Sequence, residues 1–309
     1  MGILVIGSFM MDLVVYTPRA PKDGETIIGN SFSRFPGGKG ANQAVSAARL
    51  GGKVTMVGKV GTDLYGDEAL ATLKKEQINT QYLLRDKNFA TGVGFVTLEE
   101  NGSNRIIVVP GANMNYKSSD LEKIKGLIRN SKILIVQLEM ELNMIEQAVS
   151  YAAFYQVPVI LNPAPAQVLS DDLLRNITYL TPNETEAEML TGIKIASKED
   201  AERAGNVLLD KGVKNVIITL AEKGSLIVNE NEICYVNGFS VTPIDSVAAG
   251  DAFNGALSIG ILKGKPLKDA VKYANAVGAL TVTKGGAIPS LPTDKDVDEF
   301  INKYNFVEG

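Results

Sequence analysis

One stretch in the last quarter of the sequence combines small residues, a carboxylate and the start of a helical pattern. Within residues 243–256, Ala248, Ala249 and Gly250 precede Asp251. Small side chains let a ligand approach the backbone, and the free N–H groups at a helix start attract anions. We therefore predict an anion hole formed by these three residues, and a base, Asp251, that takes the proton of an attacking hydroxyl. Taken alone, the pattern also fits a structural helix start with an aspartate cap.

The composition restricts the chemistry available to these residues. The 309 residues include no histidine and one cysteine, Cys234. This excludes Ser-His and Cys-His nucleophile pairs and histidine-based zinc sites, so a bound metal is a hard cation held by oxygen atoms. Phosphoryl transfer fits these limits, because it needs mainly alignment and charge stabilisation, which a carboxylate can assist. We interpret Cys234 as a packed structural residue.

Charge and hydropathy indicate an enzyme or binding protein for small molecules. Hydrophobic residues make up 45% of the chain, charged residues make up 21%, and the formal net charge is -4. This balance gives no basic surface for nucleic acid or an anionic membrane. The sequence begins directly with a strand-like pattern and has no signal peptide pattern and no apolar run of about 18 residues. We expect a cytoplasmic protein.

The elements that position the candidate residues follow an α/β rhythm. Continuous apolar runs occur at residues 3–8, 132–136, 157–161, 177–180 and 216–219. Helical patterns alternate with them at residues 118–130, 142–155, 185–191 and 198–212. Apolar strands separated by helices are typical of parallel sheets buried on both faces. We predict a doubly wound, mostly parallel sheet flanked by helices.

Two segments, residues 13–35 and 91–109, alternate instead with a period of two. The second contains Asn101-Gly102, a strong signal for a hairpin turn. We predict that these segments form a small antiparallel β-sheet lid on a body made of residues 1–12, 36–90 and 110–309. The alternative is that both segments extend the main sheet.

Three motifs together resemble the ribokinase-like (PfkB) family of sugar kinases, and the similarity extends over essentially the whole chain. The motifs lie at residues 37–44 (GGKGANQA), 181–186 (TPNETE) and 245–255 (DSVAAGDAFNG). Each motif alone fits a surface turn or a helix start, but their joint occurrence in this order favours a kinase. The resemblance implies transfer of the γ-phosphate of ATP to a sugar hydroxyl.

The resemblance also implies roles for individual residues. For the sugar it implies Asp12, Gly38, Lys39, Gly40, Ala41, Asn42, Glu139 and Asp251. For the nucleotide it implies Asn183, Thr219, Leu220, Ala221, Glu222, Lys223, Gly224, Gly250 and Asn275. For magnesium, organised through water, it implies Asn183 and Glu186, and for an activating potassium ion Asp245, Val247, Thr281, Lys284, Gly286 and Ser290.

Two of these assignments carry a specific expectation. Glu139 follows an apolar strand, and the alternative to a sugar contact is a solvated strand end. The family's usual Thr-Leu-Gly reads Thr-Leu-Ala in this sequence. We therefore expect Ala221 to hold a backbone conformation that glycine reaches more easily.

The residue at position 10 bears on which sugar is used. Ribokinases of this family read Gly-Ser-x-Asn-x-Asp, whereas residues 7–12 read GSFMMD, so that Met10 replaces the asparagine. Asparagine hydrogen-bonds to hydroxyls, whereas a thioether suits a CH2 group. A buried polar group without a partner costs about 1–3 kcal/mol, so an asparagine would favour ribose by about one or two powers of ten. The alternative is that Met10 only packs against the lid.

We thus predict 5-phosphorylation of 2-deoxy-D-ribose with weaker activity on ribose, as in the deoxyribokinases that the sequence resembles. The alternatives are a ribose kinase, a kinase of another sugar or a nucleoside, and a non-catalytic sugar-sensing protein that keeps the fold. The presence of Asp251 speaks against the last. Apolar lid strands with exposed edges also predict a homodimer joined through the lid.

Overall fold

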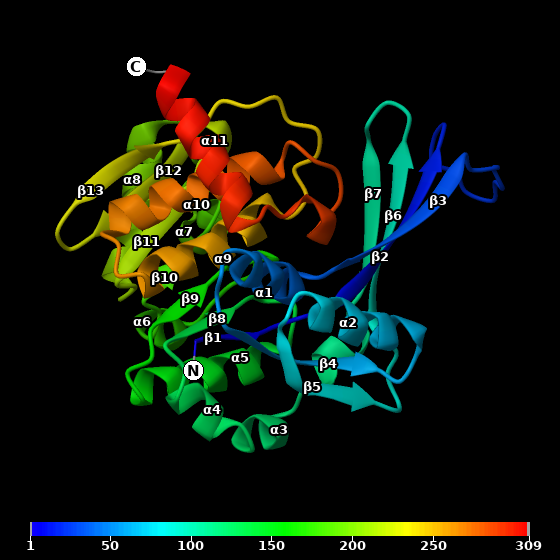
Figure 1. Cartoon of the computed structure of the whole chain (residues 1–309), viewed down its shortest axis with the longest axis horizontal. Helices are drawn as coiled ribbons and strands as arrows, with labels where there is room; N and C mark the ends of the chain where they lie inside the picture. Colours follow the sequence, from blue (N-terminus) through cyan, green and yellow to red (C-terminus); the bar gives the residue numbers. More distant parts are fainter. Residues whose placement is uncertain (1, 308–309) are drawn as a thin grey trace.

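A nine-stranded sheet forms the body of the protein in a computed structural model that describes residues 2–307 (Figure 1). In sheet order the strands are β13 (Ile233–Asn237), β12 (Gly224–Asn229), β11 (Asn215–Thr219), β10 (Tyr179–Leu180), β9 (Val159–Leu161), β8 (Ile133–Val136), β1 (Ile3–Ile6), β4 (Val54–Gly61) and β5 (Asn79–Asp86). The three strands at one edge, β11, β12 and β13, pair antiparallel with one another, and every other pair in the sheet, including β10 with β11, is parallel.

Helices cover both faces of this sheet, which confirms the predicted doubly wound α/β body (Figure 1). One face packs on α1 (Lys39–Arg49), α2 (Leu64–Lys75), α9 (Ala249–Leu262), α10 (Leu267–Thr281) and α11 (Asp294–Val307). The other face packs on α3 (Ser118–Glu122), α4 (Lys125–Arg129), α5 (Leu142–Phe154), α6 (Asp171–Arg175), α7 (Glu184–Thr191) and α8 (Lys198–Asp210). Short 3-10 turns are η1 (Gly111–Asn115), η2 (Ala221–Lys223) and η3 (Ile288–Ser290).

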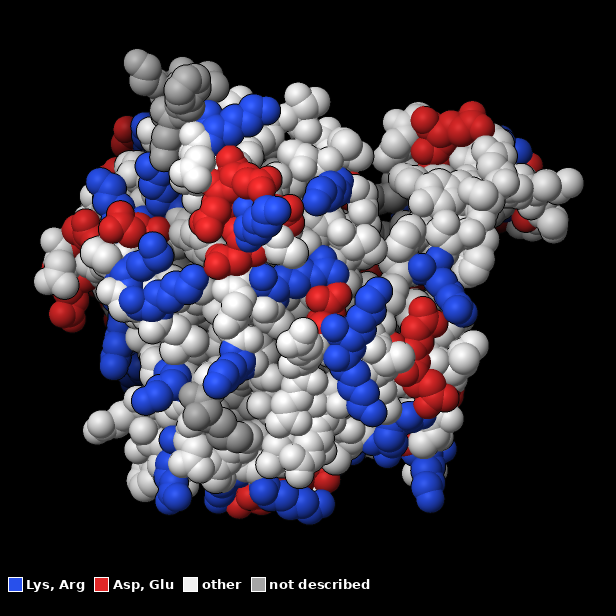
Figure 2. Space-filling view, in the orientation of Figure 1, with Lys and Arg blue, Asp and Glu red and all other residues white. Residues whose placement is uncertain are grey.

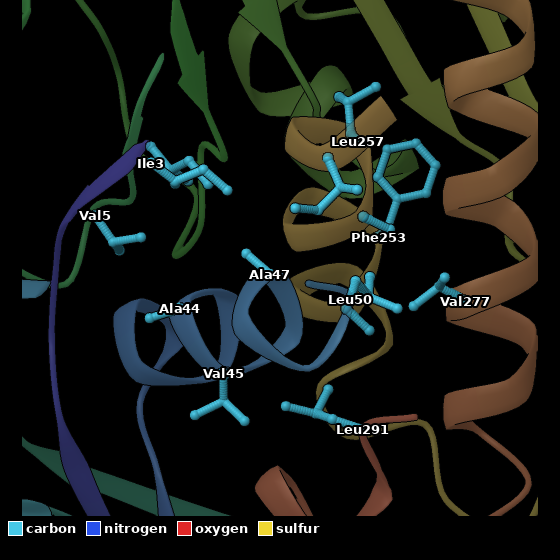
Figure 3. Close-up of a cluster of buried hydrophobic side chains, with 14 of the residues drawn as sticks. Ile3, Val5, Ala44, Val45, Ala47, Leu50, Phe253, Leu257, Val277 and Leu291 are labelled. Carbon is cyan, nitrogen blue, oxygen red and sulfur yellow. The ribbon is translucent and has the colours of Figure 1, made fainter. Parts of the chain in front are cut away.

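Alternation along the buried strands divides the core into two layers. In β1, Ile3 and Val5 point into the layer under α1 and α9, whereas Leu4 and Ile6 point into the layer under α5. Figure 3 shows the first layer, where strand side chains meet Ala44 and other small or branched residues of the helices. Because the strands are apolar on both faces, the sheet is buried on both sides, as the continuous apolar runs predict.

A second sheet of four strands stands beside the body, and we call this sheet the lid (Figure 1). Its order is β3 (Ser31–Gly37), β2 (Met10–Thr17), β6 (Gly92–Glu99) and β7 (Asn104–Val109). The outer pairs are antiparallel, as predicted, but the central strands β2 and β6 pair in parallel. The lid therefore consists of two antiparallel pairs joined side by side, and its strand β2 begins at Met10, within the residues 1–12 that the sequence analysis assigns to the body.

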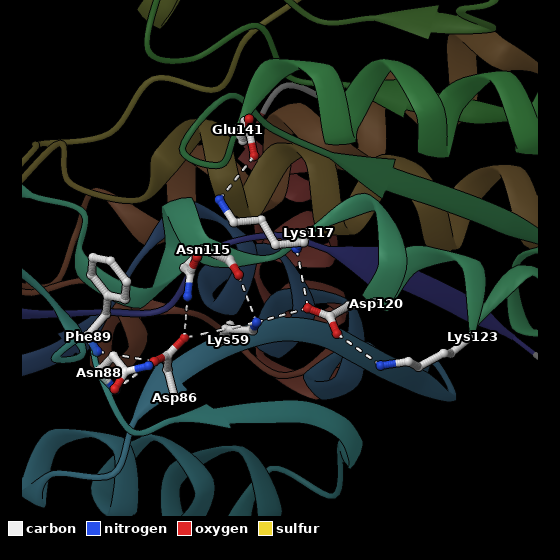
Figure 4. A network of polar contacts seen from close by, with 9 residues as sticks. All are labelled: Lys59, Asp86, Asn88, Phe89, Asn115, Lys117, Asp120, Lys123 and Glu141. Atoms are coloured by element: carbon white, nitrogen blue, oxygen red, sulfur yellow. Dashed lines mark hydrogen bonds and ion pairs between the residues drawn. The ribbon is translucent and has the colours of Figure 1, made fainter.

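A buried lysine fixes the segment that follows the lid (Figure 4). Lys59 of β4 donates to the Asn115 carbonyl oxygen at 2.7 Å and to an Asp120 carboxylate oxygen at 2.9 Å. Asn115 in turn donates to Asp86 at the end of β5 at 2.6 Å. These contacts join the edge of the main sheet to η1 and α3.

Two local differences from the sequence analysis have simple causes. The helical pattern at residues 118–130 forms two short helices, because Ile124 leaves the helical conformation and its N–H bonds to the Leu121 carbonyl. Cys234 is half-buried on β13 against the core, as expected of a packed residue. Within residues 2–307, no helix has the length and apolar character that crossing a membrane requires.

Candidate active site

The carboxyl ends of four neighbouring parallel strands meet along one edge of the main sheet. The chain proceeds from β1 to one side of the sheet and from β8 to the other, which makes their junction a topological switch point. Ligands of doubly wound proteins usually bind at such a junction. A cleft of about 1100 Å³ opens there between the body and the lid.

Asp251 lines this cleft from the first turn of α9. It is 6% exposed, and its two carboxylate oxygens accept the Nδ2–H of Asn42 and the Nε2–H of Gln43, each at 2.9 Å. Both amides belong to α1, which approaches α9 so closely that a Cβ at Gly255 would collide with Ser46. The predicted base is therefore held by the motif at residues 37–44.

The turn before α9 lines the cleft with backbone N–H groups, of which that of Ala249 makes a long hydrogen bond of 3.4 Å to the Ser246 carbonyl. Ala248 adopts the left-handed conformation with φ 62°, and the helix begins at Ala249. A Cβ built at Gly250 would meet no atom within 4 Å. The first N–H groups of a helix have no helical partner and carry partial positive charge, so this turn can receive an anion beside Asp251.

Glu139, after β8, is not a solvated strand end. Its carboxylate accepts hydrogen bonds from the Ser8 hydroxyl and, at 2.9 Å, from the backbone N–H of Lys39. Burial raises the pKa of Glu139 above its ordinary value against the opposing charge of Lys39. The contacts bring the ends of β1 and β8 together with the start of α1. Gly40 and Ala41 are buried inside that helix start rather than lining the cleft.

Met10 and Asp12 both face the cleft from β2, because side chains two apart on a strand share a face. Met10 is 4% exposed. Glycines flank the Asp12 carboxylate on both neighbouring strands, since a Cβ at Gly37 or Gly94 would lie 2.8 or 2.5 Å from it. Burial first, and then the charges of Glu139 and Asp251, raise the pKa of Asp12 to about 6.

Lys39 supplies a positive charge among these carboxylates. Burial lowers the pKa of Lys39, but the carboxylates of Asp251, Glu139 and Glu186 outweigh this effect and raise it. The ammonium group therefore stays charged at neutral pH. A cation in the cleft favours a substrate that carries or develops negative charge.

Asn183 and Glu186 form the helix start that the sequence offers as an alternative, and they also line the cleft. The Asn183 side chain accepts from the Glu186 N–H at 2.8 Å, and Glu186 accepts from the Asn183 N–H at 2.9 Å, which is a capping box. Burial raises the pKa of Glu186. Its second oxygen accepts no hydrogen bond from residues 2–307, so it suits a water molecule on a hard cation.

No three acidic or sulfur-bearing side chains converge as a direct metal site within the described residues. A magnesium ion at Asn183 and Glu186 would therefore be held through water and phosphate oxygens.

The segment predicted to hold the nucleotide follows β11. Ala221 has φ 50°, which confirms the expected strained conformation. Thr219 lines the cleft, while Ala221, Glu222 and Lys223 form the exposed turn η2. The Asn275 amide donates to the backbone oxygens of Val236 at 3.1 Å and Asn237 at 3.3 Å. Its NH2 group therefore binds the edge strand β13 of the main sheet.

Two loops predicted to hold potassium lie side by side. The Asp245 carboxylate accepts the Val247 N–H at 3.0 Å and the Gly286 N–H at 2.9 Å. The Thr281 carbonyl accepts the Lys284 N–H, and the Ser290 hydroxyl donates to the Ala287 carbonyl at 2.7 Å. Carboxylate and carbonyl oxygens are the ligands of hard cations, so this donor set fits an alkali ion.

Comparison with known proteins decides the family. The model of the pfkB family of carbohydrate kinases matches residues 2–294. The chain belongs to this family. It is a phosphotransferase that acts on a sugar hydroxyl, of the ribokinase or deoxyribokinase type.

Relatives of both types cover almost the whole of this carbohydrate kinase. A ribokinase of Haemophilus influenzae is 39% identical over 96% of this chain and 97% of its own. A deoxyribokinase of Salmonella typhi is 35% identical over 98% of this chain and 99% of its own. Among solved structures, Arabidopsis thaliana ribokinase complexed with ribose and ATP superposes with a TM-score of 0.90, at 32% identity over 97% of this chain and 98% of that one.

Sequence reasoning missed several polar residues of the kinase's site. Gln43 contacts Asp251. The buried Gln137, Asn162 and Thr181 directly follow β8, β9 and β10, and the buried Ser8 lies two residues after β1. Their place in the sequence could have identified them, because a polar residue just after a buried parallel strand lies at the sheet edge where ligands bind.

Proposed function

We propose that this carbohydrate kinase transfers the γ-phosphate of ATP to the 5-hydroxyl of 2-deoxy-D-ribose. Met10 carries the sugar preference in this proposal. It is a buried side chain on the face of β2 that also bears Asp12, and both line the cleft. The Met10 thioether offers no hydrogen-bond donor, so it suits the CH2 group at the 2-position of deoxyribose. The Asp12 carboxylate accepts a hydrogen bond from the 3-hydroxyl.

The proposed transfer runs between the lid and α9. Asp251 takes the proton of the 5-hydroxyl, the oxygen forms a bond to the γ-phosphorus, and the bond to ADP breaks. The N–H groups at the start of α9 and the Lys39 ammonium stabilise the negative charge on the transferring group. The A. thaliana ribokinase, which binds ribose and ATP, supports ATP as the donor.

Two cations complete the proposal. Asn183 and Glu186 would organise magnesium, which neutralises phosphate charge, through water molecules. Asp245 and carbonyl groups of the loops at residues 245–247 and 281–290 would hold potassium beside the anion hole. A cytoplasmic location belongs to the same proposal, since ATP is a cytoplasmic metabolite.

A comparison of kcat/KM for 2-deoxy-D-ribose and D-ribose tests the sugar preference. We expect deoxyribose to be favoured and Met10→Asn to shift the ratio toward ribose by about tenfold or more, because the amide can hydrogen-bond to the 2-hydroxyl. Val14→Ala, on the same face of β2, is the matched control and should leave the ratio unchanged. A wild-type preference for ribose of tenfold or more would identify a ribokinase instead.

Asp251→Asn separates a kinase from a sugar-sensing protein. We expect this variant to lose turnover by at least about a hundredfold and to retain sugar binding in calorimetry, since the amide cannot accept the proton. A wild-type protein that binds the sugar and never consumes ATP would favour the non-catalytic alternative.

A further inference from the structure

The side chain of Asp251 lies at the end of a buried chain of amides that reaches across the sheet edge. Gln43 donates through Nε2 to Asp251 at 2.9 Å and to the Asn162 Oδ1 at 3.1 Å. Gln137, just after β8, donates through Nε2 to the Gln43 Oε1 at 2.6 Å. All three amide residues are at most 6% exposed, so water does not replace these contacts.

The Asp251 carboxylate sets the direction of the hydrogen bonds that link these amides. An ionised carboxylate only accepts, so Gln43 must turn its NH2 group to Asp251 and its carbonyl oxygen to Gln137. Gln137 must then turn its own NH2 group to Gln43. Its carbonyl oxygen is left buried without a donor among the described residues.

The unpaired side-chain oxygen of Gln137 indicates the role of this series of hydrogen-bonded amides. A buried polar atom without a partner lowers stability, and such atoms in folded proteins require an explanation. An apolar side chain at position 137 would avoid the cost. The glutamine is therefore unfavourable for folding by itself, and its useful contact is the one that orients Gln43.

The same series of buried hydrogen bonds continues toward the predicted anion hole. Asn162 lies beside Thr181, whose hydroxyl donates to the Asn254 Oδ1 at 2.7 Å. The Asn254 NH2 group donates to the Gly250 carbonyl at 2.8 Å. The base and the turn that receives the phosphate thus share one buried set of hydrogen bonds.

We propose that Gln43 is a positioning residue for the base, and that Gln137 fixes Gln43 in the orientation that donates to Asp251. Gln43 and Asn42 each donate to one carboxylate oxygen, which prevents rotation of the carboxylate and keeps it aimed at the arriving sugar hydroxyl. This inference rests on the proposed role of Asp251. Its test uses whichever pentose the wild-type enzyme phosphorylates.

Gln137→Met is the first variant, because it removes both the orienting donor and the unpaired oxygen. We expect kcat to fall by about tenfold, KM for the sugar to stay within about twofold, and the melting temperature to stay unchanged or rise. Gln147→Met is the matched control, since Gln147 also has a buried, unpaired oxygen but lies on α5 away from the cleft. It should leave kcat unchanged.

Gln43→Glu gives a signature that a purely structural role would not produce. When protonated, the introduced carboxyl can still donate to Asp251, whereas its ionised form repels it. We expect kcat near the wild-type value at low pH and a loss of about a hundredfold above the pKa of the new pair, where the wild type stays active.

Three outcomes decide between the ideas. An unchanged kcat for Gln137→Met, or a wild-type pH profile for Gln43→Glu, would overturn the positioning role alone. Full turnover by Asp251→Asn would overturn the proposed base, whatever the glutamine variants do. If Gln43→Glu does not fold, Gln137→Met and its control still decide the question.

Discussion

At the scale of single residues, we expect the charge state of Asp12 to control how activity depends on pH. Its pKa of about 6 is raised by burial and by the charges of Glu139 and Asp251. The proposed hydrogen bond from the 3-hydroxyl is strongest to an ionised carboxylate. We expect kcat/KM for the sugar to fall by about tenfold per pH unit below pH 6 and to be constant above it. Rate measurements from pH 5 to 8 test this, and a flat profile would contradict it.

The same residue has an opposite effect on folding. Its folded-state pKa lies above the unfolded value of 3.8, so the folded state binds the proton more tightly. The contribution of Asp12 to stability is therefore greatest below pH 4 and is lost as the pH rises through 6. Asp12→Asn should raise the melting temperature of the sugar-free protein at pH 8 and not at pH 4.

Site residues that belong to a recognisable motif could be predicted from the sequence. Contacts between residues that only folding brings together could not. Asp251, Asn42 and Glu139 do meet around one cleft. Gln43 lies inside the motif at residues 37–44, one helical turn from Lys39, but its contact with Gln137 links positions 94 residues apart. Nothing local in the sequence specifies such a pair.

At the scale of elements, one asparagine fixes the base of the lid. Asn113 accepts the Phe9 N–H at 3.1 Å and donates to the Phe9 carbonyl at 2.8 Å, as a paired strand residue would. Phe9 directly precedes Met10, the first residue of β2. The side chain therefore joins the segment that enters the lid to the segment that leaves it.

Asn113→Ala should cost roughly 2–3 kcal/mol of unfolding free energy, because it leaves buried backbone groups of Phe9 without partners. We also expect KM for the sugar to rise more than KM for ATP, because the start of β2, which carries Met10 and Asp12, is no longer held in place. Denaturant titration and steady-state kinetics measure both effects. Asn206→Ala on the exposed face of α8 is the control, and equal effects of the two changes would refute the role.

The elements themselves could be predicted from periodicity, but not all of their pairing. The apolar runs at residues 132–136 and 216–219 mark β8 and β11. The parallel contact of β2 with β6 could not be predicted, because the two strands lie about 80 residues apart and each carries its own antiparallel partner. Pairing of that kind depends on how the whole body brings the chain together.

At the scale of the whole molecule, the lid presents apolar surface that a second copy of the chain would cover. Most of the lid surface in Figure 2 is uncharged, whereas charges of both signs lie over the body. Ile106 is 56% exposed and Ile107, on the other face of edge strand β7, is 67% exposed. An apolar edge strand that is open on both faces is a site for pairing between chains.

We propose a homodimer joined through the lid, and the double variant Ile106→Glu, Ile107→Lys tests it. We expect the wild type to sediment as a dimer and the variant as a monomer with an unchanged far-UV spectrum, because charges on β7 oppose burial. Phe154→Lys is the control, since Phe154 is 79% exposed at the end of α5. A monomeric wild type, or a variant that stays dimeric, would exclude this interface.

The cleft draws its two halves from separate parts of the chain. Met10 and Asp12 belong to a lid strand, whereas Asp251 and its amides belong to helices and strand ends of the body. If Met10 sets the sugar preference as proposed, substitutions in this one short strand would change which sugar binds and leave the groups around Asp251 as they are.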